Sequence, residues 1–293
     1  MKCLIIYNPK SGKQNVVRRI DYIVSVLKQR FEVVDKKASF YDGETRDLAR
    51  DACGRYDALV VAGGDGTLHE AICGIAPCEN KPRLGIIPAG TINDVSRSLK
   101  IPRGIDSCLR VILNGKTICH DLFKINNDYG IYASAMGLLT DISYKVNSAP
   151  KKKFGKLAYY FSIPKFMFGH NTFDIELETE SGNIKEKCSL FLVLNSRSVA
   201  GRKVDKKNDM TDGKVELVVF SSKKEKVKLS DIVKIVQFFA FGIRKKTKNY
   251  KIIPTSKFNV RLDSPKSLNV DGEKVKSDTY NFEVISPGVE IFC

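Results

Sequence analysis

The sequence predicts an α/β fold with a mostly parallel sheet over residues 1–122, followed by an antiparallel β-sandwich over residues 123–293. In the first part, short apolar runs alternate with helical patterns, which is typical of parallel strands covered on both faces. In the later part, polar and apolar residues alternate between turn signals, as they do in antiparallel strands. A chain of 293 residues is long enough for two domains with cores of their own.

Three junctions of strand, turn and helix organise the first part. The apolar run CLIIY at 3–7 leads into NPKSGK and then into a helical pattern over 16–31. ALVVA at 58–62 leads into GGDGT and a helix, and LGIIPAGT at 84–91 leads into the helical INDVSRSL. Ligands of parallel sheets gather beyond the carboxyl ends of the strands, where we expect all three turns to lie.

The second turn has the features of a phosphate site. Gly63, Gly64 and Gly66 allow positive φ and let the backbone approach a ligand. Thr67 and Glu70 form a T-x-x-E pattern, which predicts a capping box at the start of the next helix. Free N–H groups and the helix dipole at that point favour an anion, most naturally a phosphate.

Asp65 is the unexpected member of this turn. A carboxylate beside a phosphate is repulsive unless it holds a cation or takes a proton from a hydroxyl, and phosphoryl transfer needs both. The structural alternative is a tight turn without a ligand. Two common cofactor motifs do not fit, because Gln14 stands where a Walker A loop has Ser or Thr, and His69 occupies a small-residue position of the dinucleotide fingerprint.

Composition limits the class of protein without choosing a function. The net charge of +16 suits anionic partners, which include nucleotides, nucleic acid and acidic membrane surfaces. The eight cysteines show no CxxC pair or zinc spacing, and we expect them to be reduced, mostly buried small hydrophobes. The first apolar run is shorter than a signal-peptide core of roughly 7–15 residues. No apolar stretch reaches the roughly 18–20 residues of a spanning helix, so we expect a cytoplasmic protein.

Three motifs together carry a family resemblance. NPKSGK at 8–13, GGDGTLHE at 63–70 and PAGTINDVSRSL at 88–99 resemble the catalytic domain of the diacylglycerol kinase and sphingosine kinase superfamily, in particular its soluble bacterial lipid kinases. GGDGT is shared with NAD kinases and loosely with phosphofructokinases, whereas the P-x-G-T-x-N-D block selects lipid kinases. The resemblance implies an NAD kinase and diacylglycerol kinase-like first domain and a β-sandwich second domain.

The resemblance also implies that ATP is bound by the three turns and by Ser39. The family usually has Asn at the position of His69, and Thr at that of Ser39, where the alignment needs a gap. Thr91 and Asn93 suit hydrogen bonds to phosphate or ribose, and Asp94 completes a T-x-x-D cap; a simple helix cap is the alternative. The implied ATP-binding residues are Asn8, Pro9, Lys10, Ser11, Gly12, Ser39, Gly63, Gly64, Asp65, Gly66, Thr67, Leu68, His69, Thr91 and Asn93.

Two acidic turns in the later part have both a structural and a functional interpretation. Asp212-Gly213 fits a hairpin turn, and the resemblance implies a structural Mg2+ site with Asp212 as anchor and Asp209 and Lys214 as neighbours. Asp271-Gly272 also fits a turn, and in the family a D-G-E sequence faces the nucleotide cleft. The resemblance therefore implies Glu273 as the catalytic base beside Asp271, and the sequence leaves open whether Asp65 or Glu273 takes the proton.

One segment of the later part bears on membrane contact. KKKFGKLAYYFSIPKFMFG at 151–169 interleaves lysines with aromatic residues, and we expect it near the lipid entrance; an ordinary helix packed between domains is the alternative. A helical pattern over 229–243 has a wide apolar face, which we expect to be core. The basic runs at 223–228 and 244–248 are expected to be solvated loops.

These observations predict an ATP- and Mg2+-dependent lipid kinase of phospholipid metabolism that phosphorylates diacylglycerol to phosphatidic acid, or a related lipid. We expect it in the cytoplasm, peripherally on the inner face of the membrane, with a lipid substrate and no nucleic acid; a homodimer is left open. The first alternative is a kinase of another acceptor, such as NAD or a long-chain base. The second is a non-catalytic protein that binds nucleotide and membrane.

Overall fold

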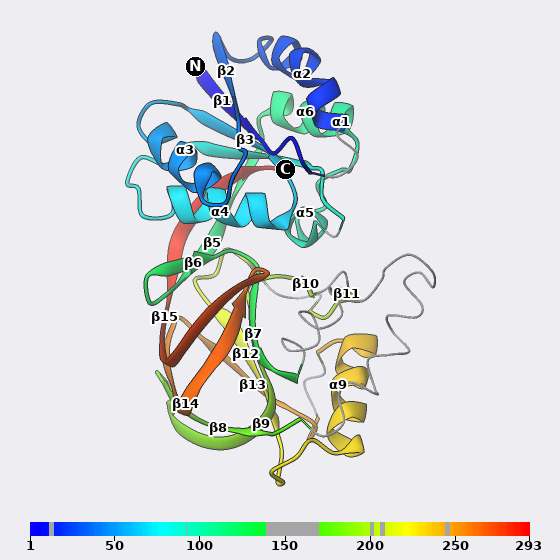
Figure 1. The fold of residues 1–293 in the computed structure, drawn as a ribbon, viewed down its shortest axis with the longest axis vertical. Coiled ribbons are helices and arrows are strands. Elements are labelled where there is room, and N and C mark those ends of the chain that lie inside the picture. Colours follow the sequence, from blue (N-terminus) through cyan, green and yellow to red (C-terminus); the bar gives the residue numbers. More distant parts are fainter. Residues whose placement is uncertain (12–14, 92, 139–169, 200–201, 206–208, 244–246) are drawn as a thin grey trace.

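The computed structural model describes residues 1–293 with the exception of 12–14, 92, 139–169, 200–201, 206–208 and 244–246 (Figure 1). The predicted segment 151–169 lies outside the described residues. The described elements, in chain order, are β1 (Lys2–Tyr7), α1 (Asn15–Arg18), α2 (Ile20–Leu27), β2 (Val33–Ala38), α3 (Glu44–Ala52), β3 (Ala58–Gly63), α4 (Asp65–Ile75), β4 (Arg83–Pro88), α5 (Asp94–Ser98), α6 (Ile105–Asn114), β5 (Thr117–Ile125), β6 (Asp128–Gly130), β7 (Ala133–Gly137), β8 (Phe173–Thr179), β9 (Gly182–Leu194), β10 (Ser198–Val199), β11 (Arg202–Lys203), β12 (Val215–Ser221), α9 (Leu229–Phe241), β13 (Lys251–Thr255), β14 (Lys257–Val270) and β15 (Glu273–Phe292).

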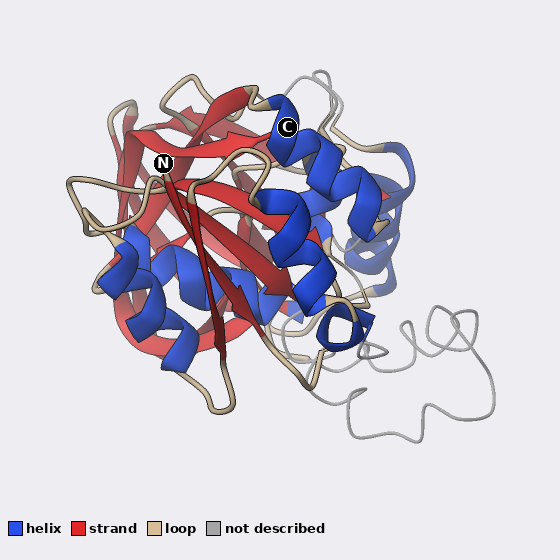
Figure 2. Cartoon of the chain, turned by 90° about the horizontal axis from the view of Figure 1, so that it is seen from above, coloured by secondary structure: helices blue, strands red, loops and turns tan. Residues whose placement is uncertain are grey.

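The first part is a parallel sheet between two layers of helices, as the sequence predicts. Its strands pair in the order β4-β3-β1-β2, all in parallel. β3 is buried along its whole length and β1 along most of it, which explains their unbroken apolar sequences. Helices α2 and α6 cover one face and α3 and α4 the other (Figures 1 and 2). The carboxyl ends of the strands therefore form one edge that is open to a ligand.

The second part consists of antiparallel strands, which confirms the other half of the predicted fold class. β9 pairs with β7, β8 and β12, and β14 pairs with β7, β8 and β15. Because β8 and β7 both join β9 to β14, the sheet closes on itself, and the layers of the predicted sandwich share their long strands. Its core includes Phe191, Phe258 and Tyr280, all nearly inaccessible to solvent.

The two parts are joined by strands as well as by sequence. β5 contains residue 122, the predicted boundary, and pairs with β15 on both sides of it. The far end of β15 reaches the first sheet, where Ile291 pairs in parallel with Leu84 of β4 (Figure 1). Val289 and Phe292 are buried in the hydrophobic core of the first part. The division of the chain into domains 1–122 and 123–293 stays a prediction. In the structure, the end of β15 completes the core and the sheet of the first part.

Both predicted capping boxes are wrong. α4 begins at Asp65, with Gly64 as its N-cap and no side-chain cap, so Thr67 lies inside the helix. The carboxylate of Glu70 instead accepts a hydrogen bond from the N–H of Gly43 (3.1 Å). α5 begins at Asp94, so Thr91 lies before the helix. The cause is tertiary, because the N–H groups that begin α5 are bound by a carboxylate from another turn, described below.

The helix predicted over 229–243 is present as α9, but only half of its apolar surface is core. Ile232, Ile235 and Phe238 are buried, whereas Val233 and Val236 are exposed. None of the described helices has both the length and the apolar character needed to span a bilayer.

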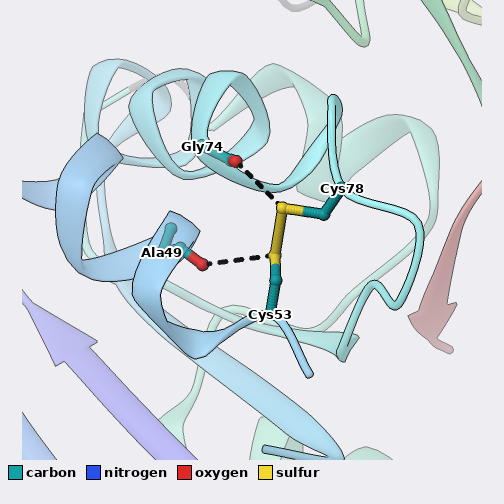
Figure 3. The surroundings of a disulfide bond; sticks show 4 residues. All are labelled: Ala49, Cys53, Gly74 and Cys78. Atoms are coloured by element: carbon teal, nitrogen blue, oxygen red, sulfur yellow. Dashed lines mark hydrogen bonds between the residues drawn. A yellow bond between two sulfur atoms is a disulfide. The ribbon is translucent and has the colours of Figure 1, made fainter. Parts of the chain in front are cut away.

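The prediction that all cysteines are reduced is wrong, because Cys53 and Cys78 form a disulfide with a Cα–Cα distance of 6.4 Å. Cys53 follows α3 and Cys78 follows α4, and these helices pack side by side (Figure 3). Their close approach depends on Gly74, since a Cβ there would lie 2.3 Å from the carbonyl oxygen of Arg46. Helix packing therefore creates the pairing, and sequence spacing does not reveal it. The remaining cysteines are free, and Cys3, Cys73, Cys108 and Cys188 are buried as expected.

Replacing both disulfide cysteines by serine should lower the free energy of unfolding by about 3 kcal/mol, because the bond closes a loop between residues 25 apart. Denaturant unfolding of Cys53→Ser/Cys78→Ser without reductant measures the difference. The control is Cys293→Ser, which removes a free cysteine. Alkylation of both Cys53 and Cys78 in the unreduced native protein would refute the disulfide.

Candidate active site

Three turns lie side by side at the carboxyl edge of the parallel sheet. The N–H of Asn8, after β1, donates to the carbonyl oxygen of Ala62 in β3 (3.2 Å). The N–H of Ala89, after β4, donates to the carbonyl oxygen of Gly63 (2.8 Å). The sequence motifs at 8–13, 63–70 and 88–99 are thus brought together, and Gly12 lies outside the described residues.

The glycines of these turns serve close packing rather than positive φ. Gly63, Gly64 and Gly66 do not use the positive φ that glycine allows. A Cβ on Gly63 would lie 2.5 Å from the side chain of Thr67, and a Cβ on Gly90 would lie 2.6 Å from the Cα of Gly64. The GGDGT and PAGT turns therefore touch backbone to backbone, which only glycine allows.

Asp65 ties these two turns together. Its Oδ2 accepts a hydrogen bond from the N–H of Asn93 (2.8 Å), and its Oδ1 accepts one from the N–H of Asp94 (2.8 Å). Burial raises the pKa of Asp65, although the two N–H groups oppose this effect. Both carboxylate oxygens are thus used to hold the start of α5 against the start of α4.

Two neighbouring polar side chains are also committed to the framework. The side-chain amide of Asn93, a residue with φ of 53°, donates to the carbonyl oxygen of Gly90 (2.7 Å) and accepts from its N–H (3.0 Å). Asp94 accepts a hydrogen bond from the hydroxyl of Tyr132 (2.6 Å), which belongs to the second part. Asn93 therefore closes its own turn, and Asp94 links the two parts of the molecule.

Asp271 organises the facing side of the site. Its carboxylate accepts hydrogen bonds from the N–H groups of Ile131 (2.7 Å), Tyr132 (3.0 Å) and Ala133 (2.9 Å). Asp271 and Gly272 form a two-residue hairpin between β14 and β15, with φ of 52° and 111°. The predicted turn is thus present, and its aspartate is bound on several sides.

His69 of α4 lies against the same carboxylate. Its Nδ1 is 3.5 Å from Oδ2 of Asp271, and its Nε2 is 3.5 Å from Sγ of Cys73. Burial alone would lower the pKa of His69, but the hydrogen bonds to Asp271 and Cys73 outweigh it and raise the pKa to about 10. His69 and Asp271 form a buried ion pair between α4 and the hairpin. Leu68 is also buried, in the hydrophobic core, so nucleotide contacts of these two residues would involve their backbone.

Glu273, the first residue of β15, is the free carboxylate of the site. It is exposed, and among the described residues its side chain makes no hydrogen bond or ion pair. Its Oε1 lies 3.7 Å from the point that a Cβ on Gly66 would occupy. Apart from the chain neighbours of Gly66 and the backbone of its own helix, no other described atom comes within 4 Å of that point. The structure therefore places Glu273 over the first turn of α4.

The other predicted nucleotide residues lie at the same edge, with different availability. Asn8 accepts a hydrogen bond from the N–H of Lys10 (2.8 Å), which shapes the first turn. The N–H of Ser39 donates to the carbonyl oxygen of Tyr7 (2.9 Å), which brings the end of β2 beside that turn. The hydroxyl of Ser39 is buried and accepts from Thr45 (2.9 Å), whereas Thr91 is exposed.

The predicted metal-binding turn precedes β12. Asp209 accepts from the N–H and hydroxyl of Thr211, and Asp212 accepts from the N–H of Lys214 (3.0 Å). The N–H of Gly213 donates to Asp121 (2.7 Å). Within the described ranges, no group of three or more His, Cys, Asp or Glu side chains is close enough to hold a metal ion. Any cation here would need carbonyl or water ligands besides Asp209 and Asp212.

Sequence analysis missed several residues of this region. Asp121 and Tyr132 bind across the two parts, and only the fold brings them near the motifs. Arg97 lies inside the third motif, four residues after Asn93. Residues four apart lie on the same face of a helix, so this spacing could have indicated that Arg97 lies near the site. Its Nε is buried without a hydrogen-bond partner among the described residues, so an anion there would satisfy it.

Comparisons with known proteins agree with this geometry. Residues 2–125 match the family model of the diacylglycerol kinase catalytic domain. A Staphylococcus epidermidis protein named diacylglycerol kinase is 33% identical over 98% of this chain and 90% of its own length. A protein of the same name from Staphylococcus saprophyticus is 33% identical over 98% of this chain and 94% of its own length. The chain belongs to the diacylglycerol kinase family.

The fold of this diacylglycerol kinase family member is shared by solved structures. The crystal structure of a diacylglycerol kinase from Bacillus anthracis aligns with a TM-score of 0.79 at 20% identity, covering 99% of this chain and 96% of the other. A second structure from that organism gives a TM-score of 0.85 at 23% identity, covering 99% and 94%. At these identities the structures support the fold alone. Family membership makes the protein a lipid kinase, so the edge around Gly66 is its candidate active site.

The ion pair of His69 gives the kinase a pH-dependent stability. Its pKa is about 10 in the folded state and 6.5 ordinarily, so its stabilisation is complete below pH 6.5 and is lost as the pH rises through 10. The difference in unfolding free energy between wild type and His69→Asn should therefore shrink over that range. Denaturant unfolding at a series of pH values measures it, and a difference independent of pH would contradict the ion pair.

Proposed function

We propose that the protein transfers the γ-phosphoryl group of ATP to the hydroxyl of diacylglycerol, giving phosphatidic acid, with Mg2+ as cofactor. The observation that carries the proposal is the unpaired carboxylate of Glu273 over Gly66, at the first turn of α4. The names of the curated relatives support diacylglycerol as the acceptor. Family membership supports use of a nucleotide.

The α4 start provides the phosphate site in this proposal. The first N–H groups of a helix lack partners within it and carry partial positive charge, which favours phosphate. Gly66 keeps the helix start uncrowded, because a Cβ there would meet only Glu273 outside its own chain segment. The Nε of Arg97 in α5 is buried without a partner among the described residues, and an anion would satisfy it. The turns at 8–12 and 63–69, together with Ser39, Thr91 and Asn93, would surround the nucleotide. Leu68 and His69 would contribute backbone groups, because their side chains are buried.

The three predicted catalytic carboxylates divide into one base and two positioning residues. Asp65 and Asp271 each use both oxygens to accept hydrogen bonds from the framework. Glu273 has its oxygens free, and a general base needs a free lone pair directed at the proton it takes. Glu273 would accept the proton of the lipid hydroxyl while the hydroxyl oxygen attacks the γ-phosphorus of ATP and ADP leaves.

The donor chemistry of the turn before β12 fits Mg2+. Oδ2 of Asp209 and of Asp212 makes no bond to another described residue, and Mg2+ prefers such hard oxygen ligands. Asp209, Asp212 and the carbonyl of Lys214 would hold this structural ion. Mg2+ bound with ATP supplies charge neutralisation of the phosphates.

A diacylglycerol substrate implies work at a membrane surface. Diacylglycerol partitions into bilayers because of its two acyl chains, so the enzyme would bind peripherally to the inner face of the membrane from the cytoplasm.

Glu273→Gln should lower kcat on diacylglycerol about 10²- to 10⁴-fold and leave the KM for ATP within about threefold, because it removes the base but no nucleotide contact. The assay is transfer of radiolabelled γ-phosphate from ATP with Mg2+ to a lipid panel in mixed micelles. The panel contains diacylglycerol, a long-chain base and a lipid-free reaction with NAD.

The matched control is Glu283→Gln, which neutralises an exposed glutamate farther along the same strand. A nearly unchanged kcat for Glu273→Gln would exclude it as the base. Phosphorylation of another acceptor, with diacylglycerol inactive, would refute the proposed substrate.

A further inference from the structure

Helix α9 carries an apolar stripe on its solvent side. Leu229 is 59% exposed, Val233 45% and Val236 50%. These residues and Ala240 follow the spacing i, i+4, i+7, i+11, which places them along one line of the helix. We call these four residues the α9 stripe. Phe241, 66% exposed, is the last residue of the helix and lies to one side of this line.

The opposite face of the helix already satisfies its packing needs. Ile232, Ile235 and Phe238 are buried in a core with Phe220 and Tyr250. More of the exposed large hydrophobic side chains of the described chain lie on α9 than on any other element. Figure 1 shows α9 in gold at the periphery of the antiparallel strands. Contiguous exposed apolar surface of this kind marks an interaction site.

Positive charges frame the α9 stripe at both ends. Before the helix, Lys223, Lys224, Lys226 and Lys228 are all exposed. The one acidic residue among them, Glu225, pairs with Lys187 (2.7 Å). After the helix, Lys248 is exposed. The surface thus combines apolar side chains, which favour burial away from water, with lysines, which attract anions.

We propose that the α9 stripe and its flanking lysines dock the protein on an anionic lipid bilayer. Apolar side chains would enter the boundary between headgroups and acyl chains, while lysines meet the anionic headgroups. The inference goes beyond the proposed function by assigning the membrane contact to a surface. It rests on the proposed function in one respect, which is that the substrate lies in a bilayer.

Charge favours the bilayer over a second copy of the chain. The spacing of the α9 stripe would also suit pairing of two helices. Parallel pairing, however, would bring the lysines at 223–228 of the two copies together, and antiparallel pairing would bring them against Lys248 of the other copy. Each copy carries a net charge of +16, so such a contact would be opposed by like charges. An anionic surface complements the same charges.

The position of α9 suits an enzyme that takes its substrate from the bilayer. After the helix, the N–H of Ile243 donates to the carbonyl oxygen of Val204 (2.6 Å). The N–H of Val204 in turn donates to the carbonyl oxygen of Arg197 (3.0 Å). The N–H of Arg197 donates to the hydroxyl of Ser98 in α5 (3.1 Å). The C-terminal end of α9 is therefore tied to the helix that Asp65 holds at the candidate active site.

The test is co-sedimentation with vesicles of equal parts phosphatidylcholine and phosphatidylglycerol, without diacylglycerol or nucleotide. Val233→Glu/Val236→Glu should lower the partition coefficient at least about tenfold. Lys223→Glu/Lys224→Glu/Lys226→Glu should weaken it similarly, and added NaCl should weaken wild-type binding. The second variant keeps the test valid if the first fails to fold, which thermal unfolding checks.

The matched control is Val33→Glu, which places the same charge at an exposed valine on β2; its binding should equal that of the wild type. Unchanged binding of both α9 variants, or no binding of the wild type, would overturn the proposal. So would a wild-type dimer in sedimentation velocity that Val233→Glu/Val236→Glu converts to a monomer. Because no kinase reaction is involved, failure of the phosphorylation assay with intact vesicle binding would affect the proposed function alone.

Discussion

The carboxylate of Asp271 accepts hydrogen bonds from three consecutive backbone N–H groups, at residues 131–133, and faces the imidazole of His69. A buried carboxylate is stable only with such partners, so these contacts also hold the hairpin in its left-handed conformation. The hairpin fixes where β15 begins, and therefore where Glu273 stands. Because His69 belongs to α4, the same carboxylate fixes Glu273 relative to the helix start that it faces.

A second set of contacts fixes the remaining side of the site. Asp65 binds the start of α5, and Asp94 at that start binds Tyr132 from the antiparallel part. Charged side chains in this region thus hold backbone segments of both parts in one geometry. Such preorganisation holds a reacting group in its productive position before the substrate binds, so little free energy is spent on reorganisation during the reaction. Asp65, Asp94 and Asp271 bind groups of the protein itself, whereas the carboxylate of Glu273 makes no such bond to the described residues.

The local sequence predicted those elements whose own residue pattern indicates their structure, such as buried strands and glycine-rich turns. The apolar run at 58–62 could only be a buried strand, and the glycines after it could only be a turn. β2 was missed because VVDKKA is an edge strand with most side chains in solvent, so it lacks an apolar run. The cap predicted for α5 failed because Asp65 binds the N–H groups that a local cap would bind, and that of α4 failed because the helix begins before Thr67 and Glu70 binds Gly43. The role of Asp271 needed the three N–H groups at 131–133, far away in sequence.

β15 begins at Glu273 and ends at Phe292, so one strand leads from the antiparallel part into the parallel sheet. Its last residues complete a core whose other members come mainly from the first part of the chain. During synthesis, an N-terminal domain usually folds before the following one has left the ribosome. Here the first sheet would wait with an open edge and an unfilled core until the final strand arrives. Its apolar surface would then stay exposed until the last residues of β15 are synthesised, and such exposed surface favours aggregation of an incomplete chain.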